Sequence, residues 1–170
     1  RGEAPSSPAK FRVEDTVKCD VGAINESPAK LISKKQTCDI LLDIAHNVQG
    51  MQTLSAYLEQ LSSNYNKIIF LSSILDRKDA DGMLAVLKSP SFKKEFVFSE
   101  SFHKSSLNAE ELAKKIPGSK AVHGAQVALE SVFSKASSND LIVVTGSLFF
   151  VSEIRKLICG ESFSTLAEGT

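Results

Sequence analysis

Short aliphatic runs alternate with amphipathic segments from residue 39 onward, and this alternation constrains the fold more than any other feature of the sequence. Four runs are apolar along most of their length, which predicts buried strands: ILLD (40–43), KIIFLSSIL (67–75), EFVF (95–98) and DLIVVTG (140–146). Strands that are apolar on both faces are typical of a parallel sheet covered by helices on each side.

Helical periodicity fills the intervals between these runs. The clearest case is a stripe with steps of three and four residues, formed by Val48, Met51, Leu54, Leu58 and Leu61. Further helices are predicted over 79–88, 108–116, 124–136 and 147–158, and Asn108 followed by Glu111 is an N-terminal capping pattern. We therefore predict an α/β fold, a three-layer Rossmann-like sandwich with a mostly parallel sheet of five or six strands.

The two ends of the sequence differ from this pattern. Residues 1–37 are rich in proline and serine and lack periodicity, so we expect a linker or insertion that is largely irregular, with a short edge strand over 11–19. The α/β domain is predicted over 38–160, with a flexible tail over 161–170. Because the sequence opens without methionine inside a linker-like stretch, we expect it to be a piece of a longer protein.

Composition narrows the class of partner. Twenty basic and twenty acidic residues give a formal net charge of zero, which argues against nucleic acid as the main partner. No apolar run approaches the roughly 20 residues of a membrane span. The three cysteines, Cys19, Cys38 and Cys159, form no C-x-x-C pair, so neither structural zinc nor a disulfide framework is expected. We predict a reducing, cytoplasmic setting and no metal ligands within this sequence.

The segment DIAHN (43–47) follows the first predicted strand, where ligands bind in parallel α/β sheets. In a purely structural interpretation, Asp43 holds a loop amide, Asn47 caps the next helix and His46 lies at the surface. In a functional interpretation, an acid and an imidazole lie beside the positive end of a helix, where an anion binds favourably. The residues alone leave both interpretations open.

A second polar segment, TGS, follows the last predicted strand. Gly146 would let the backbone approach a ligand closely, and Ser147 would either cap the last helix or contact that ligand. The charged cluster LDRKD (75–79) predicts a solvated loop with Asp79 as a helix cap, or else a basic pair that reaches for phosphates.

Other chemical signals are weak or absent. No partner is indicated for His103 or His123, which we expect to be solvent or core histidines. The sequence contains no G-x-x-x-x-G-K-[ST], no G-x-G-x-x-G and no G-x-S-x-G pattern. It therefore cannot cradle a triphosphate by the usual glycine-rich loop.

LLDIAHN resembles the D-G-A-H-N-P motif that opens the C-terminal domain of folylpolyglutamate synthases and dihydrofolate synthases, in the Mur ligase superfamily. ILDRKD is similar to the family's D-K-D segment, HGAQVAL to its alanine-rich helix and LIVVTGSLFFVSEIR to its last strand and helix, so the resemblance covers residues 39–158. HN and TGS favour the folate branch over cell-wall Mur ligases, which tend to show D-Y-A-H-x-P and G-K-G-H-E. Ile44 replaces the usual glycine and Val48 the usual proline, so Ile44 should either hinder ligand approach or turn into the core.

The resemblance implies a reaction in which ATP phosphorylates a folate carboxylate and the amine of L-glutamate then attacks the acyl phosphate. It implies nucleotide binding by Asp43, Asn47 and Arg1, the last matching the arginine of a P-G-R-x-E linker motif. It also implies a catalytic His46 near the transferred phosphate and the incoming glutamate, and a glutamate contact by Ser147. The ligands would be ATP, Mg²⁺, L-glutamate and folate or dihydropteroate.

In this family the P-loop and most Mg²⁺ ligands belong to an N-terminal ATPase domain, which would be the main protein partner of this one. We therefore expect the 170-residue chain alone to be inactive. Two alternatives stay open: the C-terminal domain of a cell-wall Mur amino-acid ligase, and a non-catalytic α/β binding module.

Overall fold

The computed structural model describes residues 38–159. The predicted linker, the predicted edge strand over 11–19, Arg1 and the predicted tail lie outside the described residues. The described elements, in chain order, are β1 (Asp39–Leu42), α1 (Val48–Leu61), the 3₁₀ turn η2 (Ser62–Asn64), β2 (Lys67–Ser72), α2 (Ala80–Lys88), β3 (Lys94–Phe98), α3 (Ala109–Lys114), β4 (Lys120–Ala121), α4 (Ala125–Phe133), β5 (Asp140–Thr145) and α5 (Leu148–Cys159). No helix among residues 38–159 is long and apolar enough to cross a membrane.

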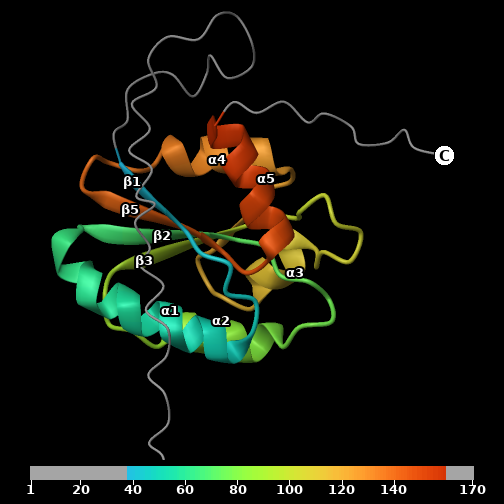
Figure 1. The fold of residues 1–170 in the computed structure, drawn as a ribbon, viewed down its shortest axis with the longest axis horizontal. Helices are drawn as coiled ribbons and strands as arrows, with labels where there is room; N and C mark the ends of the chain where they lie inside the picture. The colour runs from blue at the N-terminus through green and yellow to red at the C-terminus, as the bar shows by residue number, and fades with distance from the viewer. Residues whose placement is uncertain (1–37, 160–170) are drawn as a thin grey trace, which may run out of the picture.

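The described strands form one sheet in the order β1-β5-β2-β3-β4, and every pairing is parallel. Figure 1 shows α1 and α2 on one side of the sheet and α4 and α5 on the other. The predicted three-layer α/β fold with a parallel sheet is thus confirmed.

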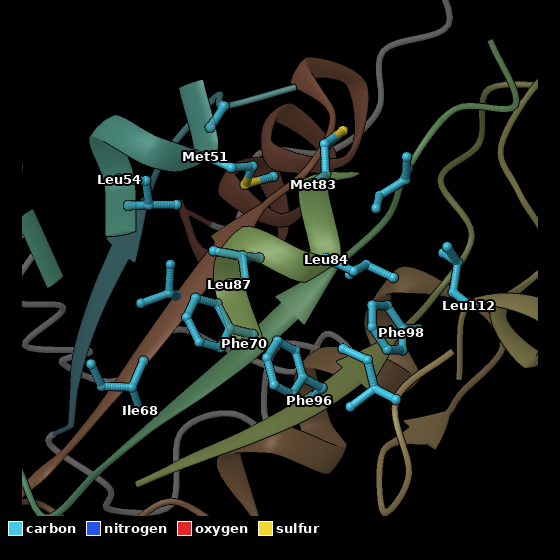
Figure 2. Packing of buried hydrophobic residues seen from close by; sticks show 14 of the residues in the cluster. Met51, Leu54, Ile68, Phe70, Met83, Leu84, Leu87, Phe96, Phe98 and Leu112 are labelled. Carbon is cyan, nitrogen blue, oxygen red and sulfur yellow. The ribbon is translucent and has the colours of Figure 1, made fainter. Parts of the chain in front are cut away.

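The sheet separates two apolar cores because alternate side chains of each strand face opposite sides. In β2, Ile68 and Phe70 pack with α1, α2 and α3, whereas Ile69 and Leu71 pack with α4 and α5. Figure 2 shows the first core, in which the rings of Phe70 and Phe96, paired across β2 and β3, stack with centroids 4.9 Å apart. Both faces of the central strands are therefore buried from solvent, as in a parallel sheet covered by helices on each side.

The chain order of the strands fixes the edge at which ligands are expected. Strand β5 lies between β1 and β2, and its following helix α5 packs on the opposite face from α1 and α2. The chain thus leaves the carboxyl ends of β1 and β5 toward opposite faces, and ligands of open α/β sheets bind at the edge where this happens. The segments DIAHN and TGS both lie at this edge.

Three helices begin at side-chain caps that were predicted from the sequence. The side chains of Asn47, Asp79 and Asn108 accept hydrogen bonds from the backbone N–H three residues later, at 2.7, 2.9 and 3.1 Å. The short strand β4 was not predicted, because two residues carry no periodicity. The strand predicted over 67–75 ends at Ser72, because the following residues leave the sheet toward a bridge between Leu75 and Ser106.

Candidate functional site

Backbone contacts join the loops after β1 and β5 at the carboxyl edge of the sheet. The Gly146 N–H donates to the Ala45 carbonyl at 3.0 Å, and the Thr145 hydroxyl contacts the same carbonyl oxygen at 3.4 Å. The Asp43 N–H donates to the Val144 carbonyl at 3.0 Å. Two polar segments that lie 100 residues apart in the sequence are therefore held against each other.

Asp43 is half-buried at the end of β1, and one of its carboxylate oxygens accepts the Ala45 N–H at 2.7 Å. Burial raises the pKa of the Asp43 carboxyl, and the hydrogen bond from Ala45 partly offsets that rise. This contact is the one that the structural interpretation predicts, in which Asp43 holds a loop amide. It occupies one of the two carboxylate oxygens and fixes the direction of the group.

His46 is exposed, and its Nδ1 lies 2.9 Å from the Ile44 carbonyl oxygen. A carbonyl only accepts hydrogen bonds, so Nδ1 must carry the proton and Nε2 keeps its lone pair in the neutral ring. Asn47 caps α1 through its side-chain oxygen. The structural interpretation thus explains the cap and the loop amide, while the imidazole presents a nitrogen able to accept a proton.

Ile44 does not turn into the core, because 55% of its surface is exposed. The isoleucine that replaces the glycine of the D-G-A-H-N-P motif therefore adds an apolar side chain to the outside of the loop that carries Asp43 and His46.

Gly146 has a different role from the one expected. Its φ is +105°, and an added Cβ would lie 2.4 Å from the Ser73 carbonyl oxygen and 2.6 Å from the Ser72 Oγ. The missing side chain lets the loop after β5 pack against the loop after β2. The prediction that Gly146 serves close approach of a ligand is not supported by these contacts, since protein atoms fill that space.

Ser147 occupies the position that precedes α5, because its carbonyl accepts the Val151 N–H at 3.0 Å. Its side chain is 1% exposed, and its hydroxyl has no hydrogen-bond partner among the described residues. Of the two interpretations left open for Ser147, the side-chain cap is not observed. A buried hydroxyl without a partner costs about 1–3 kcal/mol, and this one lies at the positive end of a 12-residue helix, which favours negative charge.

A second polar cluster, which the sequence did not indicate, lies beyond β3. The His123 ring is exposed, as expected, but its Nδ1 and Nε2 contact the carboxylates of Glu100 and Glu110 at 3.2 and 2.5 Å. Hydrogen bonding to Glu110 and the charge of Glu100 raise the pKa of His123. A doubly protonated ring accounts for both contacts.

Magnesium does not fit the described residues well. The cluster of Glu100, Glu110 and His123 is the one group of three potential metal ligands within residues 38–159, and Asp43 is not part of it. Mg²⁺ prefers octahedral oxygen ligands, and the imidazole already pairs with both carboxylates.

The LDRKD loop behaves as the structural interpretation predicted at Asp79, which caps α2. An open groove of about 550 Å³ adjoins this loop between α2 and α3. Its lining carries both charge signs, and Lys115 pairs with Asp81 at 2.9 Å. The groove lies on the α1–α3 face, away from Ser147, and its lining has no excess of positive charge that would select phosphates.

Comparison with known proteins assigns the family. The family model described as "Mur ligase, glutamate ligase domain" matches residues 29–148. The chain belongs to this family. It is 30% identical over 131 residues to the dihydrofolate synthase/folylpolyglutamate synthase of Bacillus subtilis, an alignment that covers 76% of this chain and 30% of that protein.

Solved structures share the fold. E. coli FolC in complex with DHPP and ADP is similar with a TM-score of 0.68 and 21% identity, over 74% of this chain and 30% of that one. A bifunctional folylpolyglutamate synthase/dihydrofolate synthase with Mn, AMPPNP and L-glutamate bound is similar with a TM-score of 0.66 and 21% identity, over 79% of this chain and 32% of that one. The predicted resemblance to the folate branch is confirmed, and the chain spans about 30% of the length of these relatives.

Proposed function

We propose that this chain forms the C-terminal part of an ATP-dependent ligase that joins L-glutamate to a carboxylate of folate or dihydropteroate. A carboxylate oxygen of that substrate attacks the γ-phosphorus of ATP, and ADP leaves. The amine nitrogen of glutamate then attacks the acyl carbon, phosphate leaves, and the nitrogen loses a proton as the amide forms. The glutamate ligase family match and the names of the relatives support this reaction.

Ser147 carries the proposal that glutamate binds at this edge. Its hydroxyl is buried and has no partner among the described residues, at the start of α5. A glutamate carboxylate would accept the hydroxyl proton and lie at the positive end of the helix, which compensates both the desolvated hydroxyl and the anionic charge.

His46 would act on the reacting atoms. With Nδ1 donating to the Ile44 carbonyl, Nε2 has a lone pair that can accept the proton released by the glutamate amine. The charged ring that results would also stabilise the leaving phosphate. Because the imidazole is exposed, it can reach a substrate held beside the edge.

Asp43, Asn47 and Arg1 would contact the nucleotide. The carboxylate of Asp43 is directed by the Ala45 N–H and has a second oxygen that can accept a hydroxyl proton from ATP. Asn47 uses its side-chain oxygen for the cap, so its amide nitrogen would be the group that donates to the ligand. Arg1 enters the proposal through the sequence resemblance alone.

The phosphates of ATP and the Mg²⁺ ion would bind mainly to an N-terminal ATPase domain, which corresponds to the part of the relatives that this chain does not cover. The domain over 38–160 would then close onto it and complete a divided site. Phosphoryl transfer depends mostly on positioning and charge stabilisation, so a second domain contributes without a covalent nucleophile. Cytoplasmic location, predicted from the cysteine pattern, belongs to the same proposal.

The test is a product assay on the full-length protein that carries this chain. We expect glutamate-dependent release of ADP with dihydropteroate or a reduced folate, and a product heavier by one glutamate residue in mass spectrometry. ADP release that does not depend on glutamate, or that responds instead to a muramoyl-nucleotide and its amino acid, would contradict the proposal.

A further inference from the structure

The segment 99–107, between β3 and α3, lies against the first half of α5. The Phe102 N–H donates to the Glu153 carboxylate at 3.1 Å. The His103 ring stacks on the Phe149 ring with centroids 4.3 Å apart, and Phe102 meets Phe149 edge to face at 6.0 Å. This aromatic contact brings His103 to the first turn of α5, where Phe149 is two residues from Ser147.

Hydrogen bonds join the other side of the same segment to the loop after β2. The hydroxyls of Ser106 and Ser73 lie 2.9 Å apart, and the Ser101 N–H donates to the Ser106 Oγ at 3.1 Å. The Leu107 N–H donates to the Ile74 carbonyl at 2.8 Å. Contacts on both sides hold the segment in one conformation, so its side chains are positioned before any ligand binds.

His103 is oriented as a hydrogen-bond donor. Its Nδ1 accepts the Ser105 N–H at 3.1 Å, so the proton of the neutral ring is on Nε2. The ring plane is fixed by the stack on Phe149. The side chain is only half-buried, and no hydrogen bond engages Nε2 in the part of the chain that the structure describes. The imidazole therefore offers one oriented N–H beside the start of α5.

We propose that His103 is a specificity-determining residue of this site, whose Nε2–H donates to a carboxylate of the amino-acid substrate. The inference rests on the proposed function, in which Ser147 and the N-terminus of α5 hold that carboxylate. Ser147 and His103 would then donate to it from two separate segments. Lys104, exposed on the same segment, adds positive charge nearby. Donated to the side-chain carboxylate, these two hydrogen bonds would select an acidic amino acid over a neutral one.

The experiment separates the donor from the ring. In the full-length protein, His103→Phe keeps a ring on Phe149 and removes both the Nε2–H donor and the acceptor of the half-buried Ser105 N–H, whereas His103→Gln restores an N–H donor without the ring. For His103→Phe we expect the KM for glutamate to rise roughly 10- to 100-fold, the effect of one hydrogen bond to a charged group. The KM for ATP and kcat should change by less than about twofold, and the melting temperature by no more than a few degrees. His103→Gln should recover most of the affinity for glutamate.

His123→Gln is the matched control, since that histidine pairs with Glu100 and Glu110 and should leave both KM values unchanged. Wild-type turnover with an unaltered KM for glutamate in His103→Phe would overturn this inference alone. Equal losses for ATP and glutamate with a lower melting temperature would also overturn it, because they indicate a structural role. Absence of glutamate-dependent turnover in the wild-type protein would instead refute the proposed function.

Discussion

Replacement of Gly146 by alanine tests the packing at the centre of the candidate site. Gly146 has φ of +105°, and a Cβ there would lie 2.4 Å from a backbone oxygen of Ser73, which no rotamer change can move. Forcing this φ on alanine costs about 1–3 kcal/mol. Shifting the packed backbone of Ser73 costs about 1–3 kcal/mol more.

We therefore expect Gly146→Ala to lower the free energy of unfolding by about 2–6 kcal/mol. For a domain of this size that corresponds to a melting temperature lower by roughly 5–30 °C. The measurement is urea unfolding and thermal melting of the purified 170-residue chain, followed by circular dichroism. The loss should appear in the midpoint with the denaturant slope unchanged.

Gly118→Ala is the matched control, because Gly118 has a φ of +84° and nothing within 4 Å of an added Cβ. Its free energy of unfolding should fall only by the conformational cost of a positive φ in alanine, about 1–2 kcal/mol. Equal losses for the two variants would refute the reasoning, since they would show that the approach of Gly146 to Ser73 carries no energetic cost.

Three further predictions concern the polar groups. His46→Ala in the full-length protein should lower turnover roughly 10²- to 10³-fold with little change in melting temperature, because the side chain is exposed. Near-wild-type turnover would show that His46 has no catalytic role. Ser147→Ala should raise the KM for glutamate more than that for ATP, and the melting temperature of the ligand-free protein should hold or rise because a buried unpaired hydroxyl is removed. An unchanged KM for glutamate would contradict the ligand role. Because folding raises the pKa of His123, its stabilising contribution is full below the unfolded pKa and is lost as the pH rises through the folded pKa. In urea unfolding, the difference in stability between wild type and His123→Gln should therefore shrink from pH 6 to pH 9. A constant difference would show that the ion pairs of His123 are not stabilising.

Much of the fold could be predicted because its signals are local. Apolar runs gave β1, β2, β3 and β5, and cap residues such as Asn47 and Asn108 marked helix starts to within one residue. The two-residue strand β4 could not be predicted, since it is defined by pairing with β3 and not by its own residues.

The candidate site was predicted where polar residues follow strands, and was missed where contacts depend on distant segments. Placing Asp43 and Ser147 at one edge required only that both strands be parallel. The roles of Gly146, His103 and His123 depend on residues that are 13 to 74 positions away in the sequence, so no local pattern reports them. For the same reason the unpaired hydroxyl of Ser147 was not distinguishable from a helix cap.

Our central proposal is that this chain holds the glutamate contacts and only a minor part of the nucleotide contacts of a divided ligase site. The most direct test is titration of the purified 170-residue chain with ATP, followed by heteronuclear NMR, beside assays of phosphate release and glutamate incorporation. Without a glycine-rich phosphate loop, we expect dissociation constants in the millimolar range, on the order of −4 kcal/mol, with shifts confined to residues near Asp43 and no turnover. Micromolar ATP binding, or any turnover by the chain alone, would contradict the account and place the phosphate site within this domain.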